Sequence, residues 1–131
     1  MSDIAVVKRV YQALAERDVA ALFELYSPDC VITQDERLPW GGRFEGHDGF
    51  VEFGTTLTDT IDSAVTIDAI FEAEGTVFEF GRTRGTVRAT GKAFDIPEVH
   101  QWKVHEGRVV EAHFAIDTPA MLKALGSTGK P

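Results

Sequence analysis

The spacing of apolar residues changes once along this chain, and the change restricts the folds that it can adopt. In the N-terminal half, apolar side chains recur every three or four positions, as at Ile4, Val7, Tyr11 and Leu14, which is the spacing of one helix face. Within Val65–Ala73 they alternate with polar residues, which is the spacing of a strand with one buried face. Helices that precede antiparallel strands are typical of an α+β fold, in which the helices cover one face of the sheet.

The sequence predicts three helices, a four-stranded antiparallel meander and a short C-terminal helix. Residues suited to cap these helices are Ser2 or Asp3, Asp18, and Thr118 before a proline, and the third helix is expected to begin near His47. The segments expected to be extended are Cys30–Thr33, Val65–Ala73, Thr76–Ala89, Ala93–His105 and Val109–Ile116. Glycines inside the strands favour bulges and coiling, so we expect a strongly curved sheet around the helices, forming a cone-shaped barrel with a central cavity.

Composition and charge narrow the classes of protein further. Hydrophobic residues make up 44% of the 131 residues and charged residues 26%, which suits one folded domain over residues 1–126 with a flexible tail over 127–131. A net charge of −8 disfavours nucleic acid as a partner, and the single cysteine, Cys30, excludes an intrachain disulfide. No signal peptide or membrane span is visible, so we expect a cytoplasmic protein without membrane attachment.

One expected strand carries ionisable residues on its apolar face. The even positions of Phe94–Val104 are apolar except for Glu98 and His100. Burying a carboxylate or an imidazole costs several kcal/mol unless it is hydrogen-bonded or lines a wet pocket. We therefore expect His100 to face the cavity. Two alternatives stay open, namely that His100 is a hydrogen-bonded core residue and that a bulge at Pro97 turns Glu98 outward.

Two further charged residues are candidates for the same cavity. Phe78, Phe80 and Arg82 share one parity of their strand, so Arg82 points into the cavity if the phenylalanines face the core. Its anionic partner would then be Glu98 or Asp117, and the alternative is a surface arginine. Asp117 ends the last strand, where a bend would bring it inward to orient the histidine or to act as a base.

The loop Gln34–Gly46 would border the entrance of the cavity. We expect Gln34 and Asp35 to lie there and Trp40 to pack on a ligand, with Tyr11 as a further ligand contact. The other aromatic walls are expected to be Phe78, Phe80, Trp102 and Phe114. No metal-ligand spacing, phosphate-binding loop or nucleophile elbow occurs in the sequence, so neither a metal nor a cofactor is expected.

Several of these segments resemble known families. The run Val10–Leu22 and the run Leu25–Asp29 resemble the nuclear transport factor 2-like superfamily. The segments similar to its SnoaL-like polyketide cyclase branch are Trp40–His47, Thr90–Lys92, Val99–Val104, Glu106–Val110 and Asp117. The resemblance extends over about Ile4–Gly126. It implies a conical fold, an inward histidine in the Val-His-x-Trp strand, a site aspartate at the end of the last strand, and a homodimer.

The superfamily includes ketosteroid isomerases, polyketide cyclases, epoxide hydrolases and dehydratases, so the resemblance does not select one reaction. The isomerase tyrosine aligns with Val10, beside Tyr11; its base aligns near Gln34, beside Asp35; and its acid aligns with His100. Since none of these positions matches, a steroid isomerase is disfavoured. The arginine–aspartate–arginine set of the epoxide hydrolases is echoed only in part.

These observations lead to two hypotheses. The first is a cofactor-free enzyme, of the isomerase or cyclase type or else a lyase or hydrolase, acting on a largely apolar carbonyl or polyketide-like compound. His100 would be its general acid or base and Asp117 the partner of His100, while Arg82 or Glu98 would set the local charge. The second is a ligand-binding or dimerisation module of the same fold that catalyses nothing.

Overall fold

The computed structural model describes residues 1–126 of the chain. They form four helices and six strands, in the order α1 (Asp3–Glu16), α2 (Val19–Leu25), β1 (Tyr26–Gln34), β2 (Gly42–Glu45), α3 (Gly46–Thr60), β3 (Ile61–Ala73), β4 (Thr76–Val87), β5 (Ala93–His105), β6 (Arg108–Ile116) and α4 (Thr118–Leu125). The tail expected over residues 127–131 lies outside the described residues. No helix among residues 1–126 has the length and apolar character needed to span a membrane.

The helices begin and end where local chemistry satisfies their free backbone groups. The Ser2 hydroxyl accepts a hydrogen bond of 3.1 Å from the Ala5 N–H at the start of α1. Asp18 caps α2 in the same way, accepting from the Ala21 N–H at 3.1 Å. Arg17 adopts a left-handed conformation (φ 54°) between the two helices, and this turns α2 back against α1.

All six strands belong to one open sheet of order β2-β1-β6-β5-β4-β3, in which β1 and β6 run parallel and the other neighbours antiparallel. The expected α+β arrangement of helices on a curved sheet is confirmed. The sheet holds the predicted four-stranded meander, β1, which contains the extended segment expected at Cys30–Thr33, and β2, which the sequence did not predict. In β1, a register shift between Tyr26 and Val31 interrupts the alternation of inward and outward residues. β2 has only four residues, which is too few for a periodic signal.

The long strands are joined by tight turns that need positive φ angles. Glu74 and Gly75 have φ values of 50° and 79°, and Glu106 and Gly107 have 50° and 78°. Two consecutive positive φ angles are the signature of the type I′ turn, whose twist matches that of the strands it connects. These turns fix the register of β4 on β3 and of β6 on β5.

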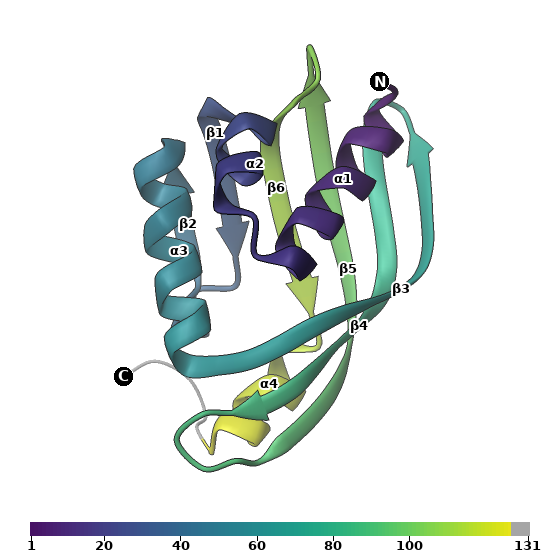
Figure 1. Cartoon of the computed structure of the whole chain (residues 1–131). Coiled ribbons are helices and arrows are strands. Elements are labelled where there is room, and N and C mark those ends of the chain that lie inside the picture. The colour runs from purple at the N-terminus through teal and green to yellow at the C-terminus, as the bar shows by residue number, and fades with distance from the viewer. Residues whose placement is uncertain (127–131) are drawn as a thin grey trace.

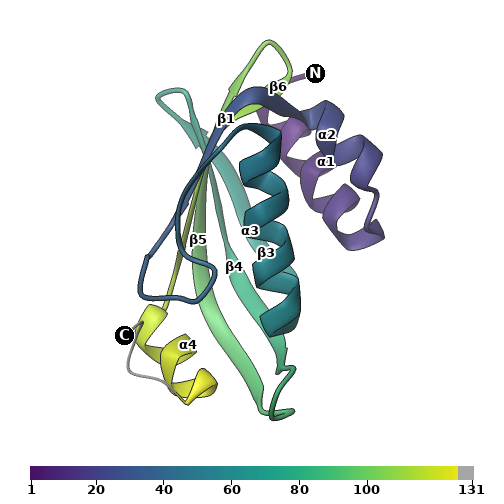
Figure 2. The same ribbon diagram turned by 90° about the vertical axis from the view of Figure 1, so that its left-hand side faces the viewer.

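Helices α1, α2 and α3 lie on one face of the curved sheet, and Figures 1 and 2 show this from two directions. Val6, Val7 and Val10 of α1 are completely buried in the core, together with Trp40 and Trp102. Helix α4 follows β6 and packs beside β5. The helices thus cover the inner face of the sheet.

The two faces of β4 are the reverse of what the sequence predicted. Glu79, Gly81 and Thr83 are buried on the inner face, whereas Phe80 is 38% exposed on the outer face. The expectation rested on the assumption that phenylalanines face the core. Instead, Phe78 packs with Phe71 and Phe80 in an outer cluster.

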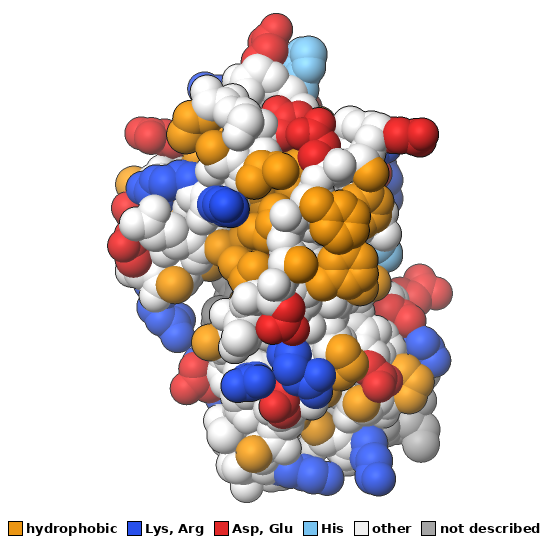
Figure 3. All heavy atoms as spheres, turned by 90° about the vertical axis from the view of Figure 1, so that its right-hand side faces the viewer, with side chains coloured by type: hydrophobic (Ala, Val, Ile, Leu, Met, Phe, Trp, Pro, Cys, Tyr) orange, Lys and Arg blue, Asp and Glu red, His pale blue; other side chains and the backbone are white. Residues whose placement is uncertain are grey.

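This outer aromatic cluster consists of Phe71 of β3 with Phe78 and Phe80 of β4. The ring of Phe71 stacks on those of Phe78 and Phe80, with centroids 5.8 and 5.2 Å apart. Figure 3 shows hydrophobic side chains gathered on the side of the molecule formed by β3 and β4. The outer face of the sheet is therefore partly apolar.

Substitution of Gly81 tests how closely β3 and β4 approach each other at the inner face of the sheet. A Cβ atom at this position would lie 2.2 Å from the Thr66 carbonyl oxygen and 2.3 Å from Glu79 Oε2. We expect Gly81→Ala to lower the free energy of unfolding by about 2 kcal/mol or more, because a backbone oxygen cannot move away cheaply. Gly54→Ala in α3, where a Cβ meets nothing within 4 Å, should instead raise it by about 1 kcal/mol. Urea denaturation measures both, and equal effects would contradict this packing.

Candidate functional site

A cavity of about 400 Å³ lies between the helices and the inner face of the sheet. Its walls are mostly apolar and come from α1, α2, α3, α4 and the strands. Trp40, Phe53, Trp102 and Phe114 are among the aromatic residues that line it, in agreement with the wall positions expected for three of them. A largely apolar cavity with a few polar groups is the usual form of a small-molecule site.

The polar end of the cavity is a buried polar cluster of Tyr11, Glu79, Glu98 and His100. Tyr11 Oη lies 2.7 Å from His100 Nδ1 and 3.3 Å from Glu79 Oε1. The Trp102 indole N–H donates to Tyr11 Oη at 3.1 Å. Helix α1 and strands β4 and β5 therefore converge on one hydrogen-bonded group.

Strand register explains how the cluster assembles. Glu79 of β4 pairs directly with His100 of β5, and Gly81 pairs with Glu98. Because paired residues of antiparallel strands share a face, the two glutamates and the histidine all point inward. Gly81, having no side chain, leaves room for the Glu79 carboxylate. The bulge considered at Pro97 does not occur, and Glu98 faces inward.

The two carboxylates are buried without a cationic partner among the described residues. Glu79 and Glu98 have completely buried side chains, whereas that of His100 is 11% exposed. His100 Nδ1 lies 3.4 Å from Glu79 Oε1 and 3.4 Å from Glu98 Oε2. Glu79 Oε2 and both Glu98 oxygens have no hydrogen-bond donor in the structure. Of these three residues, Glu98 and His100 border the cavity, and His100 is the one whose side chain is partly exposed.

Burial shifts every titratable member of the cluster toward its neutral form. Loss of hydration, followed by the proximity of Glu79, raises the pKa of Glu98 to about 10. Loss of hydration also raises the pKa of Glu79 and that of Tyr11. Burial, with a smaller effect of His113, lowers the pKa of His100 to about 3. The imidazole of His100 is thus uncharged at neutral pH. It is a weaker base than a histidine with an ordinary pKa.

Glu79, Glu98 and His100 are also the residues that could hold a metal ion. Each offers one ligand atom, and these atoms lie within 4.8 Å of one another. Two carboxylates and an imidazole are suitable ligands for a divalent ion such as Zn²⁺ or Mn²⁺. The sequence shows no metal motif because the three residues come from two strands and not from one short segment.

Gln34 and Trp40 form a second polar contact at the wall of the cavity. The Trp40 indole N–H donates to Gln34 Oε1 at 2.9 Å, and both side chains are buried. Both residues line the cavity, as does Tyr11. Trp40 is therefore a fixed part of the wall.

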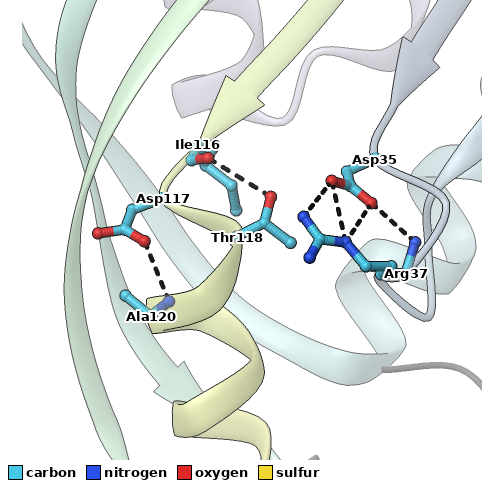
Figure 4. A network of polar contacts seen from close by, with 6 residues as sticks. All are labelled: Asp35, Arg37, Ile116, Asp117, Thr118 and Ala120. Carbon is cyan, nitrogen blue, oxygen red and sulfur yellow. Dashed lines mark hydrogen bonds and ion pairs between the residues drawn. The ribbon is translucent and has the colours of Figure 1, made fainter. Parts of the chain in front are cut away.

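Asp117, expected beside the histidine, and Asp35, expected at the cavity entrance, are both engaged in other contacts, as Figure 4 shows. Asp117 is the N-cap of α4, with its carboxylate accepting from the Ala120 N–H at 3.1 Å. The sequence assigned that role to Thr118, and this left Asp117 free for the site. Asp35 forms an ion pair of 2.7 Å with Arg37 in the loop after β1, which lowers the pKa of Asp35 to about 2.

Three other expected site residues lie on the outer face of β4. Arg82 pairs there with Asp95 of β5 and not with Glu98 or Asp117. Phe78 and Phe80 belong to the outer aromatic cluster and do not form walls of the cavity. All three corrections follow from the reversed faces of β4.

Glu79 was missed by the sequence analysis. It has the same parity as Val77, Gly81 and Thr83, and this set would have been recognised as the inner face if the phenylalanines had been assigned outward. Its signal was a lone glutamate between two phenylalanines in a strand, which is ordinarily a solvent-facing residue.

The raised pKa of Glu98 predicts an unusual dependence of stability on pH. A carboxyl group whose pKa is higher in the folded state binds more protons there, so stability falls as pH rises from its ordinary value of 4.5 to about 10. His100 opposes this only below its ordinary value of 6.5. Between about pH 7 and about pH 9 we expect the free energy of unfolding to fall by up to about 1.4 kcal/mol per pH unit.

Urea denaturation across this pH range measures that slope, and Glu98→Gln should make it shallower because the amide does not titrate. A wild-type stability that is constant over the range, or a slope unchanged by the substitution, would show that Glu98 does not retain its proton.

Comparison with known proteins agrees with the fold. The family model of the SnoaL-like domain matches residues 7–112. A nuclear transport factor 2-like protein of unknown function from Burkholderia pseudomallei is 26% identical, with a TM-score of 0.88 over 97% of this chain and 100% of that one.

Two further solved structures share the fold at lower identity. TerC, co-crystallised with polyporic acid, is 22% identical, with a TM-score of 0.84 over 95% of this chain and 98% of TerC. A putative SnoaL-like polyketide cyclase from Shewanella putrefaciens is 20% identical, with a TM-score of 0.77 over 96% of this chain and 98% of that one. The search of the curated proteins found no match. Because the family model covers most of its length, this chain belongs to the SnoaL-like family and has the nuclear transport factor 2-like fold.

Proposed function

We propose that this chain binds a largely apolar carbonyl compound in its cavity and transfers a proton on it through His100. The observation that carries this proposal is the single buried imidazole at the polar end of an apolar cavity of about 400 Å³. A cavity of this size suits a compound of a few fused or linked rings. The cyclase name of the Shewanella protein supports a polyketide-like ligand class, and the polyporic acid in the TerC crystals supports a small aromatic carbonyl ligand.

The hydrogen bonds around Tyr11 define how His100 would act. We assign the Tyr11 hydroxyl hydrogen to Glu79 Oε1, so that Tyr11 Oη accepts hydrogen bonds from Trp102 Nε1 and from His100 Nδ1. In this assignment Nδ1 carries the imidazole hydrogen, so Nε2 has a free lone pair. The neutral ring would accept a proton from the carbon beside a ligand carbonyl and return it at another position, which is the chemistry of an isomerase or cyclase.

Proton exchange into a simple ketone tests this function without knowledge of the natural substrate. 2-Tetralone is a flat bicyclic ketone with exchangeable hydrogens beside its carbonyl, and NMR in D₂O follows their replacement by deuterium. We expect the protein to accelerate this exchange and His100→Ala to slow the catalysed exchange by about a hundredfold or more, because the proton acceptor is lost.

His105→Ala is the matched control, since His105 is an exposed histidine at the end of the same strand and should not affect the rate. Binding of the ketone without accelerated exchange would favour the alternative function, a ligand-binding module that catalyses nothing.

We also propose that the chain forms a homodimer through the outer face of its sheet. The resemblance to the superfamily implies a dimer, and the exposed rings of Phe71 and Phe80, at 46% and 38% exposure, are the apolar surface that a second copy would cover.

Sedimentation velocity tests this assembly. We expect the wild-type chain to sediment as a dimer and Phe80→Asp to sediment as a monomer, because a charge would be buried in the interface. Val51→Asp, at an exposed position of α3, should leave the dimer intact. A wild-type monomer would contradict the proposal.

A further inference from the structure

The other residues of the buried polar cluster do not balance the negative charges that Glu79 and Glu98 would carry if both were ionised. Both side chains are completely buried, and three of their four oxygens have no donor. The only donors of the cluster are the Tyr11 hydroxyl and the His100 ring. Two adjacent carboxylates without a cation repel each other strongly in a poorly hydrated site. Something must therefore neutralise one of them.

A single proton between the two carboxyl groups engages two of these three oxygens and removes one of the two negative charges. In that arrangement Glu98 donates its hydroxyl hydrogen to Glu79 Oε2, while Glu79 Oε1 accepts from Tyr11. The approach of Glu79 Oε2 to Gly81 shows that this oxygen is directed toward the backbone beside Glu98, the register partner of Gly81. Of the remaining charged groups near the pair, Asp68 of β3 is exposed and negative, so it does not supply the missing charge.

We propose that Glu79 and Glu98 share one proton and thereby hold a single negative charge behind His100, where both act as positioning residues. This role rests on the proposed function of His100. When the imidazole accepts a proton from a ligand, the resulting imidazolium lies 3.4 Å from an oxygen of each glutamate. The shared charge stabilises that cation. The shared proton prevents repulsion between two ionised carboxylates while the imidazole is neutral.

The pair differs from a lone buried acid in what happens when one member is removed. With Gln at either position, the amide N–H₂ donates to the remaining carboxyl group, which no longer has a charged neighbour and ionises. Each single variant therefore keeps one negative charge and loses the shared proton. The double variant Glu79→Gln/Glu98→Gln keeps neither.

Infrared spectroscopy of the ligand-free protein in D₂O at neutral pH detects the proton directly, since a protonated carboxyl group has a carbonyl stretch that an ionised one lacks. We expect this band in the wild type and its loss in E79Q and in E98Q. Glu111→Gln is the matched control, because Glu111 is an exposed glutamate of β6 and its loss should leave the band unchanged. Absence of the band in the wild type, or its persistence in E79Q, would overturn the shared proton.

Metal analysis of the purified protein covers the rival means of neutralisation. We expect less than stoichiometric metal and no change of the infrared band on treatment with EDTA. One tightly held divalent ion per chain, with loss of thermal stability on its removal, would overturn the proposal in favour of a metal site.

The effect on His100 is measured separately by deuterium exchange into 2-tetralone. We expect each single variant to retain exchange within about tenfold of wild type and the double variant to lose about a hundredfold or more. An equally large loss in both single variants would overturn the shared-charge role. The infrared measurement needs no ligand, so failure of the proposed function and failure of the proton pair are distinguishable.

Discussion

The burial of two glutamates beside one histidine is the constraint on which the rest of this structure depends. Ionisable groups are tolerated inside a protein only where hydrogen bonds, protons or counter-charges replace lost hydration. Here Tyr11 of α1 and Trp102 of β5 supply hydrogen bonds, and the pKa shifts of Glu98 and His100 keep these groups neutral near pH 7. Such a group is out of place in a solid apolar core. Here it borders a cavity, where the partly exposed His100 side chain can contact a ligand.

The fold serves this arrangement through register and curvature. Type I′ turns hold β3 against β4 and β5 against β6, and the pairing of β4 with β5 places Glu79 opposite His100. Gly81 makes room for the carboxylate of Glu79. The curved sheet and the three helices on its inner face then leave a hollow lined by aromatic side chains. The polar cluster and the cavity are therefore consequences of the same strand pairing.

Much of this could be predicted from the sequence, and the failures have identifiable physical causes. The α+β class, the inner face of β5 and the inward orientation of His100 follow from alternation, which is reliable in long strands. The faces of β4 were misassigned because apolar residues usually face the core, and Phe78 and Phe80 were therefore expected to do so. Instead they pack in an exposed cluster. That error removed Glu79 and added Arg82 to the expected site. Asp117 was misplaced because a local choice between two capping residues cannot be made from composition alone.

A crystal structure of the chain with 2-tetralone would test the central claim most directly. If the cavity is the functional site, electron density for the ketone will lie between the aromatic walls, with the carbons beside its carbonyl facing His100 Nε2. If side chains close the cavity, or if the ketone binds only at the outer face of the sheet, the account of His100 as the acid–base residue of a ligand site is wrong.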